Sequence, residues 1–200
     1  NDLQDAYTSI RESLSQAATY NAYKVNINYI NSEKITEDNV ADQLKGQDGI
    51  MICPGFGQRG IEGKLIAAHY TRTHDIPTFG ICLGMQMMVI EFARNVLGYA
   101  DANSREMDEK TTHNVIDIME EQKNITNMGG TMRLGQYECI LKQGSRTFDI
   151  YKKENIRERH RHRYEFNNQY LTEYERAGMM CVGRNPESEL VEVVEIPGLK

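Results

Sequence analysis

A glycine–x–cysteine–x–glycine pattern at residues 80–84 limits the possible folds of this chain more than any other feature. A short apolar stretch at 77–82 leads into the turn and a long apolar stretch at 83–97 follows it, which predicts a buried strand, a sharp turn and a helix. At such a turn the central residue is held in a strained backbone conformation, so its neighbours two before and two after have to be glycine. The pattern therefore predicts a nucleophile elbow with Cys82 at its centre.

Helical and extended patterns alternate along the rest of the chain. The spacing of apolar residues predicts helices at 3–18, 36–44 (begun by Thr36), 61–73, 83–97 and 168–177, and strands at 24–30, 49–53, 77–82, 114–119, 137–141, 161–166, 179–183 and 190–196. Strands separated by helices of this length imply parallel pairing and right-handed crossovers. We therefore expect an α/β fold, with a mainly parallel twisted sheet flanked by helices, in one domain that spans residues 1–200.

Composition and charge exclude several classes of protein. A hydrophobic share of 40% and a charged share of 26% are typical of a soluble globular chain. The net charge of −6 weighs against a nucleic-acid surface, and the one basic cluster, at 157–163, is interrupted by Glu158, which leaves a phosphate-bearing small molecule as an option there. No apolar stretch approaches the ~20 residues that cross a bilayer, and no signal pattern is present. We expect a cytoplasmic protein with no membrane contact.

The four cysteines, Cys53, Cys82, Cys139 and Cys181, lie far apart without a C-x-x-C pair. We therefore expect neither a zinc site nor a disulfide framework. At the elbow the thiol of Cys82 would sit over a helix N-terminus, where unpaired N–H groups and the helix dipole favour the reactive thiolate. The amide of Leu83 would then be an oxyanion donor. The alternative is a buried cysteine between two packing glycines.

A glycine-rich loop at 54–60 directly follows the strand predicted at 49–53. In a parallel sheet this loop and the elbow emerge at the same carboxyl-terminal edge, where such folds build their sites. Glycine there lets backbone N–H groups approach a substrate oxygen, which would supply a second oxyanion donor. By itself, however, a glycine-rich turn after a strand is common.

Further candidate site residues each have a less specific sequence signal. Gln86, one helical turn beyond Cys82, could face the same pocket or the solvent, and Glu106 could hold an ammonium group or be solvated. In the run 158–165, Arg161 and Arg163 would share a face of an extended strand, and one of them could bind a carboxylate bidentately. The alternative for that run is a solvated basic edge strand. The glycine-rich segment 129–135 has no mechanism that its spacing reveals.

Taken together, these segments resemble the glutaminase domain of the CTP synthase family, which is a class I glutamine amidotransferase domain with flavodoxin-like architecture. The similarity covers essentially the whole chain, with motifs at 3–7, 55–64, 80–86, 90–95, 102–104, 129–135 and 159–165. The elbow is shared by all class I amidotransferases. The loop around Arg59, the segment 132–134 and the arginine–histidine run point to CTP synthases in particular.

The resemblance implies a role for each matching residue. Cys82 attacks the side-chain amide of L-glutamine, releases ammonia and leaves a glutamyl thioester that water resolves. The backbones of Gly55 and Leu83 form the oxyanion hole, Glu106 holds the ammonium of glutamine, and Arg163 lies near its carboxylate. The implied glutamine-binding set is Gly55, Leu83, Gly84, Met85, Gln86, Glu106 and Arg163.

The resemblance also implies partners. A synthetase domain of the same polypeptide would use ATP and Mg to aminate UTP, in a probable homotetramer, while this domain itself would hold no cofactor or metal. GTP would act as the activator through a lid containing Arg59, Gly60 and Glu62.

The chain departs from the family pattern in three places. It has one glycine, Gly55, between the proline and Phe56, where the family usually has two. The opening strand and the synthetase domain are absent. The catalytic histidine and glutamate of the family lie in a His-Pro-Glu motif after the last strand, and no histidine follows His162. We therefore expect a domain truncated at both ends that is inactive by itself, and we do not assign the base to His160 or His162.

Two other functions compete with this interpretation. Another elbow hydrolase, such as a γ-glutamyl peptidase, would share Cys82 but would need neither the arginine–histidine run nor an ammonia acceptor. A catalytically inactive interaction domain could keep the fold with an unreactive Cys82.

Overall fold

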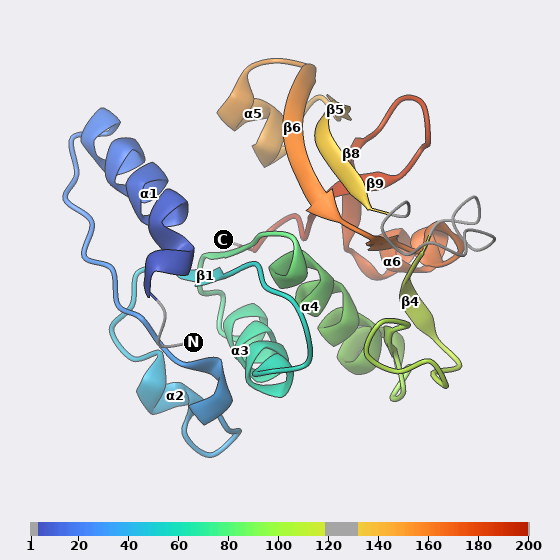
Figure 1. The fold of residues 1–200 in the computed structure, drawn as a ribbon, viewed down its shortest axis with the longest axis horizontal. Helices are drawn as coiled ribbons and strands as arrows, with labels where there is room; N and C mark the ends of the chain where they lie inside the picture. The colour runs from blue at the N-terminus through green and yellow to red at the C-terminus, as the bar shows by residue number, and fades with distance from the viewer. Residues whose placement is uncertain (1–3, 119–131, 200) are drawn as a thin grey trace.

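The computed structural model describes residues 4–118 and 132–199 (Figure 1). Its first half contains η1 (Gln4–Tyr7), α1 (Thr8–Tyr20), η2 (Ser32–Lys34), α2 (Val40–Gln43), β1 (Ile50–Ile52), α3 (Ile61–Thr73), β2 (Thr78–Gly80), α4 (Leu83–Phe92), the π-helix η3 (Ala93–Leu97), β3 (Asn103–Ser104) and β4 (Asn114–Ile118). Its second half contains β5 (Arg133–Leu141), α5 (Arg146–Tyr151), β6 (Asn155–His162), β7 (Tyr164–Phe166), η6 (Asn168–Tyr170), α6 (Leu171–Ala177), β8 (Met180–Arg184) and β9 (Val191–Glu195).

The strands pair differently in the two halves. Strand β1 pairs in parallel with β2, and β3 in parallel with β4. The described strands of the second half pair antiparallel, in the order β6-β5-β8-β9, and β7 adds antiparallel to β4. The expected α/β class is therefore confirmed, and its parallel β1–β2 pair directly precedes the elbow. The prediction that the strand at 77–82 is buried is wrong, because no residue of β2 is fully buried and Phe79 is 61% exposed.

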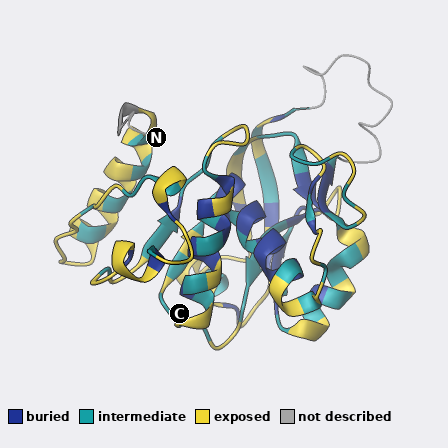
Figure 2. Cartoon of the chain, turned by 90° about the horizontal axis from the view of Figure 1, so that it is seen from below, coloured by how far each residue is buried: buried dark blue, intermediate teal, exposed yellow. Residues whose placement is uncertain are grey.

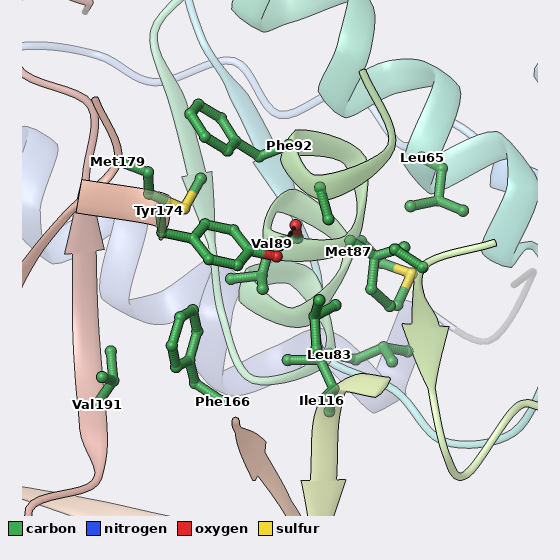
Figure 3. Packing of buried hydrophobic residues seen from close by; sticks show 14 of the residues in the cluster. Leu65, Leu83, Met87, Val89, Phe92, Ile116, Phe166, Tyr174, Met179 and Val191 are labelled. Atoms are coloured by element: carbon green, nitrogen blue, oxygen red, sulfur yellow. Dashed lines mark hydrogen bonds between the residues drawn. The ribbon is translucent and has the colours of Figure 1, made fainter. Parts of the chain in front are cut away.

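Helix α4 is the centre of the main hydrophobic core (Figure 3). Met87, Val89 and Ile90 are fully buried in it, together with Tyr174 of α6. The hydroxyl of Tyr174 donates to the carbonyl of Val89 at 2.9 Å, so this large side chain is buried with its polar atom satisfied. Removal of this apolar surface from water is the main term that holds the elbow helix in place.

The N-terminal helix α1 is confirmed but carries no buried residue and stands beside the rest of the molecule (Figures 1 and 2). The strand predicted at 24–30 is wrong, since no described strand pairs with this segment. Val25 and Tyr29 in it are exposed. The alternating pattern specifies which side chains share a face, but a strand also needs a neighbouring backbone to receive its hydrogen bonds.

Three other predictions are corrected in detail. The helix expected at 36–44 is reduced to the four residues of α2, and Thr36 does not cap it: the Thr36 amide donates to the side chain of Asn39. The helix at 83–97 changes to π-helical geometry from Ala93 onward. The strand at 161–166 is interrupted at Arg163, so that β6 pairs with β5 while β7 pairs with β4.

Candidate active site

The elbow has the geometry that the glycine pattern predicts. Cys82 joins β2 to α4 with φ 54° and ψ −108°, a left-handed value of φ that is costly for a residue with a side chain. Backbone hydrogen bonds fix the turn on both sides: the Ile81 amide donates to Ile52 at 3.2 Å, and the Gln86 amide donates to Cys82 at 3.1 Å as the first turn of α4.

The two flanking glycines are required because of close backbone contacts. A Cβ atom on Gly84 would lie 1.9 Å from the carbonyl oxygen of Ile52 in β1. One on Gly80 would lie 2.7 Å from the carbonyl carbon of Gly84. The turn therefore packs directly against the neighbouring strand, and Gly84 shapes the site from behind instead of lining it.

A small cavity of about 40 Å³ opens at the elbow. It brings together Cys82 and residues from five other parts of the chain: the loop after β1, helix α4, the segment before β4, the residue before β5, and the break between β6 and β7. Its lining residues are Gly55, Phe56, Cys82, Leu83, Gln86, Glu106, Met132, His162, Arg163 and Tyr164. Six of the residues that the sequence pointed to thus meet here: Gly55, Cys82, Leu83, Gln86, Glu106 and Arg163.

Gln86 is a buried residue and not a surface one. Its side-chain amide donates to the carbonyl of Tyr164 at 3.1 Å. This bond joins the first turn of α4 to the start of β7, so the elbow and the break that presents Arg163 are held against each other.

The thiol of Cys82 is less acidic than the sequence suggests. Burial raises its pKa, and the charges of Glu165 and Glu106 raise it further. The amide of Leu83, which hydrogen-bonds the thiol, and the ammonium of Lys64 lower the pKa but do not compensate. The expectation of a thiolate favoured by the helix terminus is therefore wrong for this state, because the desolvation of the charged form is larger than the effect of the helix end.

Two charged residues near the thiol, Glu106 and Lys64, have shifted pKa values. Glu106 lies at the rim of the cavity, where partial burial raises its pKa and the charge of Arg163 opposes this effect. Lys64 of α3 donates to the carbonyl of Cys53 at 3.0 Å, and burial lowers the pKa of its ammonium. This lysine therefore braces the backbone just before Gly55, next to the expected oxyanion hole.

Several predicted site residues lie outside the cavity. Met85 packs against the hydrophobic core. In the expected lid, Arg59 forms a bidentate pair with Glu33 at 2.9 and 2.7 Å, Gly60 takes a left-handed conformation just before α3, and Glu62 lies 3.9 Å from Arg94. None of the three lid residues lines the cavity: Arg59 and Glu62 are exposed, and Gly60 is partly buried.

Sequence reasoning did not assign Phe56, Met132, His162 or Tyr164 to the site. Tyr164 and His162 flank Arg163, so the break in the strand that exposes Arg163 also brings them to the cavity. A pattern of alternating residues contains no sign of such a break. Residues 129–131 of the segment 129–135 lie outside the described residues, whereas 132–135 are placed.

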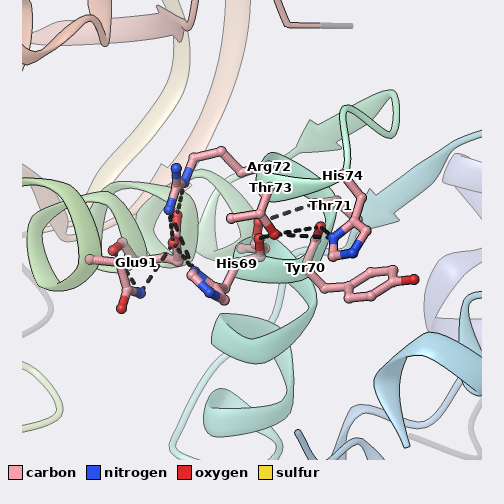
Figure 4. Close-up of polar contacts among 9 residues, drawn as sticks. His69, Tyr70, Thr71, Arg72, Thr73, His74 and Glu91 are labelled. Carbon is pink, nitrogen blue, oxygen red and sulfur yellow. Dashed lines mark hydrogen bonds and ion pairs between the residues drawn. The ribbon is translucent and has the colours of Figure 1, made fainter.

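The remaining histidines are engaged away from Cys82. His69 and Arg72 of α3 both bind the buried carboxylate of Glu91 on α4, each at 2.8 Å (Figure 4). Nδ1 of His74 donates to the carbonyl of Tyr70 at 2.8 Å at the end of the same helix, and His113 pairs with Asp101 at 2.6 Å. Within residues 4–118 and 132–199 no group of three potential metal ligands is present, and no helix there is long and apolar enough to span a membrane.

Comparison with known proteins identifies the protein family to which the chain belongs. Residues 2–198 match the family described as glutamine amidotransferase class-I. The chain therefore belongs to the class I glutamine amidotransferases.

Within this class the similarity is to CTP synthases. The chain is 73% identical over 199 residues to a CTP synthase of Bacteroides thetaiotaomicron and 61% identical to one of Porphyromonas gingivalis, and it spans 37% of the length of each. A solved structure of the Trypanosoma brucei CTPS glutaminase domain with bound acivicin is 38% identical, with a TM-score of 0.93, over 100% of this chain and 78% of that one. These relatives place the chain among the glutaminase domains of CTP synthases and confirm the resemblance seen in the motifs.

Proposed function

We propose that this chain hydrolyses the side-chain amide of L-glutamine at Cys82, and that the ammonia serves the ATP-dependent amination of UTP to CTP in a longer polypeptide. The observation that carries the first part is the cavity, which joins a nucleophile, a carboxylate and a guanidinium from distant segments. The second part is supported by the similarity to CTP synthases, of which the chain spans 37%.

In the proposed reaction the sulfur of Cys82 attacks the amide carbon of glutamine, and the electron pair of the C=O bond moves to oxygen. The amides of Leu83 and Gly55 stabilise this oxyanion. The C–N bond then breaks, ammonia leaves with the proton taken from the thiol, and a thioester remains. Water hydrolyses the thioester to glutamate and restores the thiol.

The raised pKa of Cys82 means that a proton carrier has to act during the attack. We assign this carrier to the His-Pro-Glu motif that the family has after its last strand. Consistent with that assignment, we propose that residues 1–200 alone turn over glutamine very poorly.

The same cavity explains how the amino-acid end of glutamine would be recognised. Arg163 can bind the α-carboxylate with two parallel hydrogen bonds, and Glu106 at the rim can accept from the α-ammonium. The volume of about 40 Å³ is far below the ~300 Å³ of typical ligand sites, so glutamine entry requires the cavity to open. Phe56 is the side chain placed to move, because it is 65% exposed and contacts the cavity and the guanidinium of Arg161, whose Cζ lies 5.7 Å from its ring centroid.

The regulatory part of the proposal rests on the resemblance. The loop with Arg59, Gly60 and Glu62 would be the lid that responds to GTP, and its exposure leaves it accessible to such a ligand. ATP and Mg would bind a synthetase domain, and the whole protein would be a cytoplasmic homotetramer with no cofactor in this domain.

The test compares Cys82→Ala with the unchanged full-length enzyme. Glutamine-dependent CTP formation should fall below detection, whereas formation from free ammonia should persist, because ammonia bypasses the thioester. An electrophilic glutamine analogue should label Cys82 and not the buried Cys139 or Cys181 in a peptide map. If Cys82→Ala kept glutamine-dependent activity, the assignment would be wrong. Hydrolysis of γ-glutamyl peptides without any nucleotide dependence would favour a γ-glutamyl peptidase instead.

A further inference from the structure

A buried cluster of charged side chains lies directly behind the cavity. Arg133, the first residue of β5, donates to Glu165 of β7 at 3.0 Å and to Glu192 of β9 at 2.8 Å. The second oxygen of Glu192 lies 2.6 Å from Nε2 of His160, and Glu165 lies 3.2 Å from Nδ1 of His162. The side chains of Arg133, Glu165 and Glu192 are only 5–6% exposed.

The charged groups of this cluster stabilise one another. Although burial favours neutral histidine, the bond to Glu192 raises the pKa of His160, and Glu192 itself has a lowered pKa because the bonds from His160 and Arg133 outweigh its burial. The guanidinium of Arg133 therefore contacts both carboxylates, and the imidazole of His160 bonds to Glu192. Without Arg133 the cluster would hold an uncompensated buried negative charge, which is strongly unfavourable.

The cluster also spans the point where the chain leaves one sheet for another. Arg133 pairs in register with His162, the last residue of β6, while its guanidinium holds Glu165 in β7. Arg163, the residue between these strands, lines the cavity, as do His162 and Tyr164. The guanidinium of Arg133 also lies over the ring of Tyr137, with its Cζ 4.2 Å from the ring centroid. Arg133 therefore contacts the strands on both sides of the break.

One member of the cluster acts on the nucleophile. The carboxylate of Glu165 is among the groups that disfavour the thiolate of Cys82, and the guanidinium of Arg133 lies 3.0 Å from this carboxylate. The other charged or titratable groups that face the thiol are Lys64 from α3, Glu106 from the segment before β4, and His162, Arg163 and Tyr164 from the break between β6 and β7.

We propose that Arg133 is a positioning residue for glutamine hydrolysis: it holds the break between β6 and β7 so that Arg163 faces Cys82, and it masks the charge of Glu165 from the thiol. This inference rests on the proposed function for its effect on glutamine, but its electrostatic part concerns Cys82 alone. It also gives a role to Arg133 in the segment 129–135, for which the spacing of residues revealed none.

The experiment measures alkylation of Cys82 by iodoacetamide against pH in the full-length enzyme, which requires no glutamine. The variants are Arg133→Met, Glu165→Gln and the double variant. Arg157→Met is the matched control, because Arg157 forms an exposed pair with Glu138 across the same two strands. Kinetics with glutamine and with ammonia are recorded beside the alkylation.

In Arg133→Met the alkylation midpoint should rise by about one pH unit, which is about tenfold less thiolate at neutral pH. Glutamine kcat/KM should fall at least about tenfold, while ammonia-dependent activity is kept. The double variant should return the midpoint to that of the unchanged enzyme, since the charge that Arg133 masked is gone. Arg157→Met should change neither property.

An unchanged midpoint in Arg133→Met, or a double variant that stays shifted, would overturn the masking role. If Arg133→Met does not fold, Glu165→Gln alone decides, because removing that carboxylate should lower the midpoint and an unchanged one contradicts the inference. If the unchanged enzyme did not hydrolyse glutamine, the proposed function would be wrong. The alkylation result would still test the effect of Arg133 on Cys82.

Discussion

The two sides of Cys82 are built in different ways. On the elbow side, residues 80–86 are contiguous, and their geometry follows from backbone contacts such as the one that leaves no room for a Cβ at Gly84. On the recognition side, Glu106 and Arg163 come from distant segments, and hydrogen bonds and ion pairs place them. The elbow is therefore fixed mainly by close backbone contacts, whereas the placement of Glu106 and Arg163, which we propose to recognise the substrate, depends on polar contacts between distant segments.

Gly84→Ala should have the largest effect, because it disrupts the close backbone packing of the elbow. The added methyl would lie 1.9 Å from the Ile52 carbonyl, so β1 and α4 would have to separate. We expect a loss of about 3 kcal/mol or more in the free energy of unfolding, measured by denaturant titration. Gly46→Ala serves as the control, since nothing lies within 4 Å of a Cβ there, although its positive φ of 74° costs some stability. Equal losses for both variants would show that close packing at the elbow is unimportant.

Glu106→Gln and Arg163→Gln should have the next largest effect, and only on glutamine. Each removes one charge that we assign to the amino-acid end of the substrate, so kcat/KM for glutamine should fall at least about tenfold, or 1.4 kcal/mol. Activity with ammonia should stay within about twofold of the unchanged enzyme, and the exposed Glu109→Gln serves as the control. A parallel loss with ammonia would mean that the recognition side also supports the fold, and the contrast between the two sides would break down.

Lys64→Met should have the smallest effect. It tests how a charged side chain outside the elbow changes the thiol of Cys82. The ammonium of Lys64 lowers the pKa of the Cys82 thiol, so its removal should raise that pKa further. Alkylation of Cys82 should then slow a few-fold near pH 7 and reach the same rate at high pH, where the thiol is ionised in both proteins. Lys45→Met, at an exposed position, is the control. A slower rate at every pH would indicate blocked access instead of a changed pKa.

The sequence by itself determined the features that depend on neighbouring residues. Helix α3 spans 61–73 as predicted, and the glycines two residues either side of Cys82 mark the elbow, because the positive φ of Cys82 and the close contact of Gly80 with Gly84 are both local. The motifs also carried the family and the residues Gly55, Leu83, Gln86, Glu106 and Arg163 that meet at the cavity. What these residues do in catalysis is still a prediction.

Only the tertiary structure decided the features that depend on a partner elsewhere in the chain. The segment 24–30 alternates like a strand but has no described strand beside it, and the run 161–166 is broken at Arg163 because its two parts pair with different strands. The raised pKa of Cys82 and the buried ion pairs of Arg133 likewise come from groups far apart in sequence. Periodicity specifies which side chains share a face, whereas burial and charge depend on what finally packs against that face.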